Sequence, residues 1–450
     1  MTLASLLAAA AVGGAPWSPP AALPGACSTG GPPHVVFPSS APDQRTGPGA
    51  IVWDSSPACP GGEGARMAAI GADDRPGAPA APLTGDGRTI APGGAIAVNR
   101  GPHGQIVIAG ASPGRRSHAL VVQGRAGGPF SSLLGEALPA APLALASGYL
   151  GDVALAAPPS ATDSAGASEG PRVHVERYFS NVLSRRSTVG AATTTTPPRT
   201  VALALDYRSD ALVLWTQGGA LYARDLPASG ASAVSQLLAR VGPHVRISAL
   251  LSDNNRATVA WAEDRAGRTS VYLDRSATGV RFGAPRLLER FRDPDGLASP
   301  PGSPSLVRLS TESVVLAWAG AADEHWVVRA AAVNGSGVGD ASTIASPGAN
   351  ALLAALAPGP DAEALALWTE PQPVSAGGPN TAEQALFSTH ATVAPAGRMR
   401  FDRPEQVAPP EAIGVATVAL DPGDDSAVAV WRGSGGQLRY AVRDAFSPAL

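Results

Sequence analysis

Two short polar runs stand at equivalent points of the chain, each just beyond a tryptophan. Their acidic members are Glu263, Asp264, Asp323 and Glu324. Two carboxylates at the separation used by glycoside hydrolases can act as general acid and base on a sugar. The same oxygen atoms can instead bind a cation. The plainer alternative, which the sequence favours, is that these residues are solvated charges on exposed loops. We therefore treat them as weak catalytic candidates and expect no metal site.

An arginine pair and one histidine are the other candidates for ligand contacts. Arg115 and Arg116 can bind an anion because guanidinium groups match carboxylate or phosphate, although a solvated arginine pair is the commoner finding on loops. His325 belongs to the second polar run. The seven histidines lack metal-ligand spacing, and the chain has neither a Gly-x-Ser-x-Gly elbow nor a phosphate-binding glycine loop. We expect no cofactor.

The basic residues are of one kind, since all 33 are arginine and lysine is absent. This composition excludes a Walker lysine, a Schiff-base lysine and a lysine general base. The net charge is −3 and the basic residues form no block. A nucleic-acid partner is therefore not expected.

A short apolar phrase recurs along the chain and predicts the elements that carry these residues. Six copies end in tryptophan, namely Trp53, Trp215, Trp261, Trp318, Trp368 and Trp431. Two weaker copies, 105–109 and 152–156, have alanine in that place. The copies are spaced by about 54 residues, and a fixed period of this size indicates a repeat architecture. We expect the tryptophans to pack one sheet on the next, and their role to be structural.

Each unit divides into four short strand-like runs. The first alternates and is rich in alanine, the second is continuously apolar, and the outer two alternate or carry proline. Eight such units fill residues 33–450. The chain thus resembles a β-propeller of four-stranded blades, similar to divergent secreted bacterial propellers. It lacks the repeat signatures of WD-type and sialidase-type propellers.

Eight blades are expected, with seven as the alternative because the first unit is the weakest copy. The last unit has strand-like residues at 446–450, so we expect it to supply its own fourth strand. In a propeller, loops between second and third strands and between units share one face. The resemblance implies that ligands meet that face.

Residues 1–32 are expected to lie outside the propeller, as a signal-like apolar segment followed by a proline-rich lead. This pattern predicts a secreted protein, with lipid attachment through Cys27 as the alternative. The only cysteines, Cys27 and Cys59, are expected to form a disulfide in an oxidising compartment. No run of 18 uninterrupted apolar residues follows, so a transmembrane anchor is not expected.

A complete scaffold without a recognisable catalytic set favours a non-catalytic binding protein. Its partner would be an extracellular protein, a peptide or a surface glycan, and we expect a monomer. The alternative is a carbohydrate-active hydrolase or lyase that uses the loop carboxylates. Its support comes mainly from fold analogy, and a fold does not by itself define a function.

Overall fold

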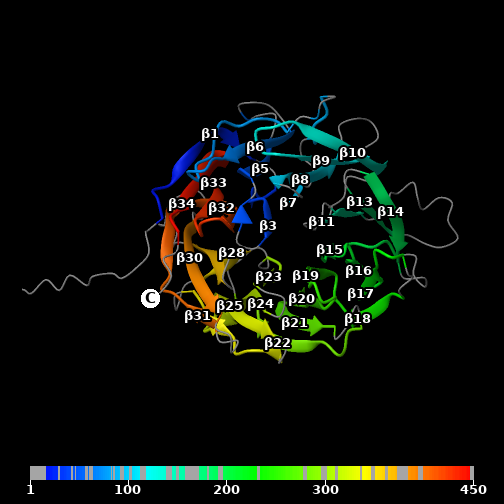
Figure 1. The fold of residues 1–450 in the computed structure, drawn as a ribbon. Helices are drawn as coiled ribbons and strands as arrows, with labels where there is room; N and C mark the ends of the chain where they lie inside the picture. The colour runs from blue at the N-terminus through cyan, green and yellow to red at the C-terminus, as the bar shows by residue number, and fades with distance from the viewer. Residues whose placement is uncertain are drawn as a thin grey trace, which may run out of the picture.

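The computed structural model is an all-β ring of eight small sheets around a central axis, an eight-bladed β-propeller (Figure 1). It describes residues 17–445, apart from 29–30, 42–43, 46, 56–58, 60–63, 83, 85–86, 92–95, 101–103, 112–117, 138–143, 148–151, 158–171, 180–181, 191–195, 231–233, 277–280, 295–301, 310–312, 335–336, 346–349, 360–362, 372–383 and 394–398. Among the described residues, no helix is long and apolar enough to cross a bilayer.

The blades are numbered from the N-terminus, and in each the strands run outward from the axis. Blade 1 contains β2 (His34–Val36), β5 (Gly49–Ser55) and β6 (Gly64–Ile70). Blade 2 contains β7 (Ala97–Arg100), β8 (Ile106–Ala111), β9 (His118–Gly124) and β10 (Phe130–Ala137). Blade 3 contains β11 (Ala144–Ser147), β12 (Asp152–Ala157), β13 (Val173–Phe179) and β14 (Val182–Val189). Blade 4 contains β15 (Val201–Leu205), β16 (Ala211–Gln217), β17 (Ala220–Leu226) and β18 (Gln236–Arg240).

Blades 5 to 8 follow the same plan. Blade 5 contains β19 (His244–Leu251), β20 (Ala257–Asp264), β21 (Arg268–Arg275) and β22 (Arg286–Arg292). Blade 6 contains β23 (Ser305–Arg308), β24 (Val314–Ala322) and β25 (His325–Asn334). Two short strands, β26 (Gly337–Val338) and β27 (Ser342–Thr343), pair with the outer edge of β25. Blade 7 contains β28 (Leu352–Pro358), β29 (Glu363–Pro371), β30 (Gln384–Val393) and β31 (Met399–Phe401). Blade 8 contains part of β32 (Glu405–Leu420), β33 (Ala427–Gly433), β34 (Gln437–Arg443) and β1 (Ala21–Cys27).

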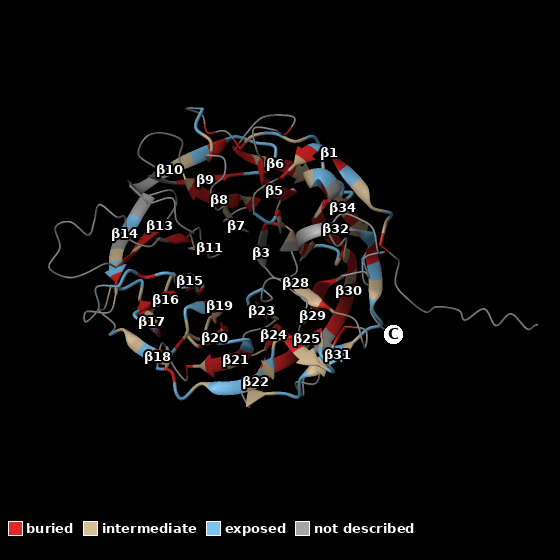
Figure 2. Cartoon of the chain, turned by 180° about the vertical axis from the view of Figure 1, so that it is seen from behind, coloured by how far each residue is buried: buried red, intermediate tan, exposed pale blue. Residues whose placement is uncertain are grey.

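The second strand of each blade is the most deeply buried element. All seven residues of β5 are buried, and β16, β20, β24 and β33 are nearly so. The six repeat tryptophans are at most 2% exposed. Three of them stack on the aromatic ring directly opposite in the third strand, as Trp215 does on Tyr222 with ring centroids 5.5 Å apart. Figure 2 shows exposed residues gathering instead on outer strands such as β18 and β22.

Blade 1 settles the number of blades at eight. It has three regular strands, and two isolated bridges, Ile70 to Pro76 and Met67 to Ala80, stand in place of a fourth. The alternative of seven blades is therefore wrong. The weak pattern of this unit reflects an irregular outer edge rather than a missing sheet.

The ring closes by a strand from the N-terminal segment, contrary to the expectation from the sequence. β1 pairs antiparallel with β34, with Ala21 opposite Tyr440 and Ala22 opposite Arg439, and so becomes the outer strand of blade 8. Residues 446–450, expected to supply that strand, lie outside the described residues. β1 contains Pro24, which an outer edge strand tolerates because one of its sides needs no backbone donor.

The first and last blades are also joined covalently. Cys27 at the end of β1 and Cys59 between β5 and β6 form the expected disulfide, with Cα atoms 5.6 Å apart. Since β1 belongs to blade 8 and β5 to blade 1, this bond crosses the seam of the ring. The seam is therefore held by backbone hydrogen bonds and by a covalent bond.

Blades 7 and 8 share one strand. Glu405–Ala412 of β32 pairs with β30 of blade 7, and Ala416–Leu420 of the same strand pairs with β33 of blade 8. The outer strand of one blade thus continues as the inner strand of the next. The two blades form a single hydrogen-bonded sheet, the 8-stranded one.

Antiparallel strands place the connecting turns on two opposite faces of the ring. The turns between first and second strands, such as 206–210, define what we call the 1–2 face. The turns between second and third strands, such as 264–268, define the 2–3 face, to which we expected ligands to bind. A small hairpin, β3 (Ser39–Ala41) with β4 (Gln44–Arg45), interrupts the first turn of blade 1. In both views of the ring it lies inside the circle of blades (Figures 1 and 2).

Candidate functional site

The first polar run on the 2–3 face is tied to its own surroundings. Glu263 is 6% exposed near the end of β20. Its Oε2 accepts a hydrogen bond from the Gly242 amide at 3.2 Å and lies 3.3 Å from Nη2 of Arg265. This carboxylate therefore already has two internal partners.

The second polar run forms a tight turn. Asp323 and Glu324 join β24 to β25 and are exposed, with φ angles of 48° and 66°. Two consecutive positive φ values are typical of the type I′ hairpin turn. His325, half-buried, begins β25. In the described part of the chain, no hydrogen bond or ion pair joins this turn to Glu263 or Asp264, and Arg115 and Arg116 lie outside the described residues.

Asp264 instead lies beside a different acid, Asp293. Burial is the main cause that raises the pKa of Asp293, and the neighbouring Asp264 raises it further. Arg246 in β19 acts in the opposite direction on the pKa of Asp293. A carboxylate pair flanked by an arginine is therefore present at the 2–3 face of blade 5, assembled from one expected residue and two that were not expected.

A more enclosed group of titratable residues lies between blades 3 and 4, on the 1–2 face. A cavity of about 310 Å³ opens there, within the size range of ligand pockets. Its lining includes Asp152, Arg177, Tyr178, Ser184, Ser209 and Ala228. Blade 3 supplies the first four of these residues and blade 4 the last two, so the cavity exists only where the two blades meet.

Arg177, at the end of β13, fixes the two blades to each other. Its Nη1 donates to the carbonyl oxygens of Ser209 at 2.8 Å and Leu226 at 2.9 Å, and its Nη2 donates to that of Pro227 at 3.1 Å. Burial lowers the pKa of this guanidinium, and the nearby Arg185 lowers it further. Arg177 therefore uses its hydrogen bonds on backbone carbonyls and acts on nearby carboxylates by charge alone.

Three deeply buried carboxylates lie in this region, and two of them, Asp152 and Asp225, interact by charge with Arg177. Asp152, Asp206 and Asp225 are 5%, 2% and 8% exposed, and each has one oxygen without a hydrogen-bond partner among the described residues. Burial raises the pKa of all three, that of Asp225 to about 6. Such under-compensated acids cluster at functional sites more often than elsewhere.

Local structure explains how one of these acids stays buried. Asp206 follows β15, and its Oδ1 accepts hydrogen bonds from the amides of Arg208 at 2.8 Å and Asp210 at 2.9 Å. Aspartate commonly caps a turn in this way. One oxygen is therefore used by the turn, while the other, Oδ2, is buried without a hydrogen-bond partner among the described residues.

The sequence alone did not single out this cavity. Asp210 belongs to a polar turn that reads as a solvated hairpin tip, and Asp152 is the first residue of a weak copy of the repeat. The available signal was an acid at the first position of a buried strand, as Asp152 is in β12. That signal does not reveal the arginine, which comes from another strand of the same blade.

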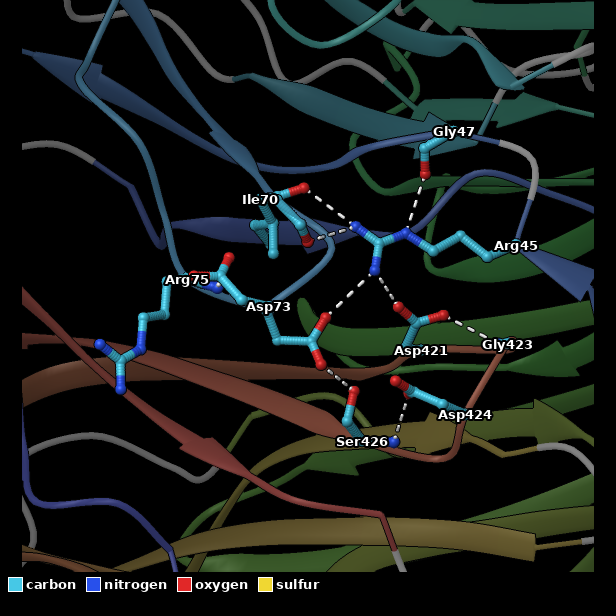
Figure 3. A network of polar contacts seen from close by, with 11 residues as sticks. Arg45, Gly47, Ile70, Asp73, Arg75, Asp421, Gly423, Asp424 and Ser426 are labelled. Carbon is cyan, nitrogen blue, oxygen red and sulfur yellow. Dashed lines mark hydrogen bonds and ion pairs between the residues drawn. The ribbon is translucent and has the colours of Figure 1, made fainter.

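A second acidic group lies on the 1–2 face at the seam of the ring. Carboxylate oxygens of Asp74, Asp421 and Asp424 lie within 4.8 Å of one another, close enough to share a cation. The guanidinium of Arg45 pairs through Nη1 with Asp74 at 3.1 Å and also with Asp421, as Figure 3 shows for the latter. Arg45 therefore supplies the positive charge that a metal ion would otherwise bring, and this group joins blades 1 and 8.

The comparisons with known proteins find similar proteins among solved structures alone. Neither a protein-family model nor a curated protein sequence matches the chain. Among solved structures, it is similar to the BP39L lectin of Burkholderia pseudomallei, at 12% identity and a TM-score of 0.48 over 86% of this chain and 100% of the lectin. It is also similar to an ulvan lyase of family PL25, at 8% identity and a TM-score of 0.42 over 76% of this chain and 90% of the lyase.

A third similar structure is the β-propeller domain of the Trilobed protease from Pyrococcus furiosus. The identity is 10% and the TM-score 0.41, over 78% of this chain and 95% of that domain. At such low identities and TM-scores, these likenesses concern the fold alone.

Proposed function

We propose that this chain is an exported, non-catalytic β-propeller that binds an extracellular protein, peptide or surface glycan. The cavity between blades 3 and 4 is the binding site in this proposal. The observation that carries it is the cavity of about 310 Å³, which is lined by polar and charged side chains of blade 3, namely Asp152, Arg177, Ser184 and Arg185, and closed by residues of blade 4. A few polar groups in fixed positions at the wall of a preformed pocket can orient a bound ligand.

The other polar groups of the cavity suit binding better than catalysis. The Ser184 hydroxyl donates to the carbonyl oxygen of Arg177 at 3.0 Å, so it is not directed at a general base. The Tyr178 hydroxyl donates to Glu176 at 2.5 Å. These groups are held in fixed positions by internal bonds, as expected for a preformed recognition site.

Export is supported by the disulfide between Cys27 and Cys59. Such bonds persist mainly in oxidising compartments. The apolar segment at the start of the sequence is consistent with secretion, and attachment through Cys27 is disfavoured because its sulfur is bonded to Cys59.

The proposal is tested by closing the cavity. Purified protein is applied to glycan and peptide arrays, and any ligand found is titrated against Ala228→Trp, which places an indole at the cavity mouth. Val234→Trp is the matched control because Val234 lies in the same blade, 86% exposed and outside the cavity lining. We expect binding to be lost in the first variant and kept in the second. Equal binding by both variants would contradict the proposed site.

The alternative function is that of a carbohydrate-active hydrolase or lyase on the 2–3 face. The observation that favours it is the pairing of Asp264 with Asp293, whose pKa is raised mainly by burial, as the general acid of a carboxylate pair requires. Its test is the amide replacement of Glu263, Asp264, Asp323 and Glu324, with Asp293→Asn as a fifth variant. Product release from a glycan panel by the natural protein, lost in these variants, would support an enzyme.

A further inference from the structure

The outer edge of blades 4 and 5 gathers exposed arginines toward the 2–3 face. They are Arg240 at the end of β18, Arg265 and Arg268 around the 2–3 turn of blade 5, and Arg290 and Arg292 in β22. We call this group the arginine edge. All five residues are exposed, and Figure 2 shows β18 and β22 on the rim of the ring. The cavity between blades 3 and 4 opens on the opposite face.

The strand register brings three of these residues together. Arg268 lies directly opposite Arg292 in the pair of β21 and β22, and Ser270 lies opposite Arg290. Directly opposed residues share one side of a sheet, about 5 Å apart, and residues two apart in a strand also share a side. Arg268, Arg290 and Arg292 therefore lie on the same side of blade 5. That side faces blade 4, because Tyr272, which belongs to it, packs against a core cluster that includes residues of blade 4.

Arg265 continues the row to blade 4. Its Nη2 donates to the carbonyl oxygen of Arg240 at 3.1 Å and lies 3.3 Å from the carboxylate of Glu263. Two backbone hydrogen bonds, of 2.9 and 3.1 Å, join Arg265 to Arg268. The five arginines thus form a continuous row across the boundary between two blades, rather than a pocket within one blade.

Most guanidiniums of the row lack an acidic partner. Apart from the pair of Arg265 and Glu263, no hydrogen bond or ion pair among the described residues joins the row to a carboxylate. Arg290 donates to two neutral hydroxyl groups, those of Ser270 at 3.1 Å and Tyr272 at 3.4 Å. The positive charge of the row is therefore largely uncompensated by direct contacts.

The nearby acids do not offset this charge either. Asp264 and Asp293 are half-buried and interact by charge with Arg246, which is not part of the row. With Glu263 and Arg246 included, six guanidiniums and three carboxylates lie at this boundary, and no acid is exposed in the described part of blades 4 and 5. The whole chain has a net charge of −3, so the positive charge is a local property of this surface.

The opposed pair of Arg268 and Arg292 is unfavourable in the free protein. Like charges directly opposite each other destabilise a sheet, and neither arginine has an acidic partner among the described residues. An anionic group between the two guanidiniums would remove this repulsion and accept hydrogen bonds from both, because each guanidinium is a fork of donors. A row of such positions favours a partner that presents several anionic groups in succession.

A linear polymer with repeated anionic groups matches the row better than a single small anion does. Proteins that bind single-stranded nucleic acid without sequence preference combine positive charge with aromatic side chains on which bases stack. The aromatic rings near the row are already engaged, since Tyr272 stacks on Trp261 and Phe291 packs against Trp326 with centroids 5.6 Å apart. An acidic polysaccharide supplies repeated charge without bases to stack.

We propose that the arginine edge binds a linear acidic polysaccharide, whose successive carboxylate or sulfate groups pair with the exposed guanidiniums. This surface is separate from the cavity between blades 3 and 4, so the proposal does not depend on that cavity being a binding site. It gives the ring a second contact surface, on the opposite face.

The test titrates the full chain with three polymers. Polygalacturonate carries only carboxylates, dextran sulfate carries only sulfates, and dextran is neutral. At low salt we expect binding of at least one charged polymer and no binding of dextran, and the comparison of the two charged polymers tells carboxylate from sulfate. Binding should weaken as salt rises, because the attraction between charges is screened.

Two double variants with the same loss of charge locate the site. Arg268→Gln with Arg292→Gln should weaken binding of the charged polymer at least about tenfold, as expected for the loss of hydrogen bonds between charged groups. The matched control is Arg281→Gln with Arg286→Gln, since both are exposed residues of blade 5. Arg286 lies opposite Leu273, on the side of the sheet that faces blade 6, so this control should keep the natural affinity.

The stability of the first double variant separates lost binding from lost folding. The midpoint of its urea unfolding should not fall, because the change relieves a repulsion between opposed charges. Should it fail to fold, Arg240→Gln in blade 4 replaces it and must weaken binding of the charged polymer. The proposal is overturned by equal binding of dextran, by natural affinity in the folded double variant, or by an equal loss in the control.

Duplex DNA and vesicles of phosphatidylglycerol are titrated in parallel. Binding of either one that is lost in the first double variant, without binding of a charged polysaccharide, would replace the polysaccharide by that partner. Ala228→Trp should leave binding of the charged polymer unchanged. If Ala228→Trp abolishes it, the polymer occupies the cavity and the assignment to the arginine edge is wrong. Failure at the arginine edge leaves the array test of the cavity unaffected, so the two proposals fail separately.

Discussion

Arg45 and Asp421 form an ion pair between residues that are 376 positions apart in the sequence. Arg45 belongs to the small hairpin of blade 1, and Asp421 lies in the first turn of blade 8 (Figure 3). The Cys27–Cys59 disulfide crosses the same seam at the 2–3 face. The ring is thus fastened at both of its faces, and this arrangement leads to the first three of the following predictions.

Replacing Arg45 by methionine should destabilise the fold. Asp421 is 1% exposed and would be left as a buried charge without its partner. Removing one member of a buried pair typically costs 3–5 kcal/mol, so we expect a loss of about 3 kcal/mol in the free energy of unfolding. Urea denaturation measures this loss.

The control for Arg45→Met is another arginine that joins two blades. Arg308 lies 2.7 Å from Asp253, and both side chains are more than a quarter exposed. Arg308→Met should cost less than ~1 kcal/mol, because exposed pairs contribute little. Equal losses for the two variants would show that burial at the seam is unimportant.

Removal of the disulfide should also destabilise the ring. Cys27→Ser with Cys59→Ser releases a cross-link that closes a loop of 32 residues, and we expect a loss of roughly 2–5 kcal/mol. Thermal unfolding of the natural protein with and without reductant gives a second measurement of the same effect.

The two fastenings should be coupled energetically. If the seam opens as one unit, combining Arg45→Met with the serine replacements should cost less than the sum of the separate losses, because the second change acts on a seam already weakened. A double-mutant cycle in urea measures the difference. Strict additivity would mean that the two faces of the seam open independently.

His390 should make stability depend on pH. Its Nε2 lies 3.0 Å from Glu363, and its Nδ1 lies 3.1 Å from Asp402. Burial alone would lower the pKa of His390, but hydrogen bonds and charge attraction from the two acids outweigh burial and raise it above 6.5. The charged ring therefore stabilises the fold fully below pH 6.5, and this contribution is lost as the pH rises through the raised value.

The variant His390→Gln tests this dependence. It should be less stable than the natural protein at pH 5.5, and the difference should shrink by pH 9. Chemical denaturation at several pH values measures both. A difference that does not change with pH would assign His390 a packing role only.

Asp274 should behave in the opposite way. Its Oδ1 accepts a hydrogen bond from the Arg275 amide at 2.8 Å, its Oδ2 has no hydrogen-bond partner among the described residues, and burial raises its pKa to about 6. The neutral acid suits the fold, so stability is lost as the pH rises from the unfolded value of 3.8 through about 6. Asp274→Asn should gain up to ~2 kcal/mol over the natural protein above pH 7 and nothing at pH 4. The same change at the exposed Asp340 should have no effect at either pH.

The repeat pattern was sufficient for the fold because it comes from local burial. A continuous apolar run ending in tryptophan, as in the strand of Trp215, can be buried only between two neighbouring sheets, and one such strand per unit gives the number of blades. The disulfide was predictable for a simpler reason: the chain has two cysteines and no other choice of partner.

Closure of the ring was not predictable in this way. The pairing of Ala21 with Tyr440 is decided by where the ring ends meet, and no periodicity within either segment reports that meeting. The cavity at Asp152 escaped notice for a related reason. It forms between the turns of two units, each of which looks like an ordinary solvated turn when considered separately.

The strand shared by blades 7 and 8 affects how the propeller can come apart. Hydrogen bonds run without interruption from β28 through β32 to β1. A blade in most of the ring can separate from its neighbours by losing side-chain contacts alone. Blades 7 and 8 can separate only when backbone hydrogen bonds between their strands are broken. Once the seam opens, the smallest piece that can peel away at that end is a pair of blades. Amide protons in β29 and β33 should therefore exchange with solvent in a single cooperative event.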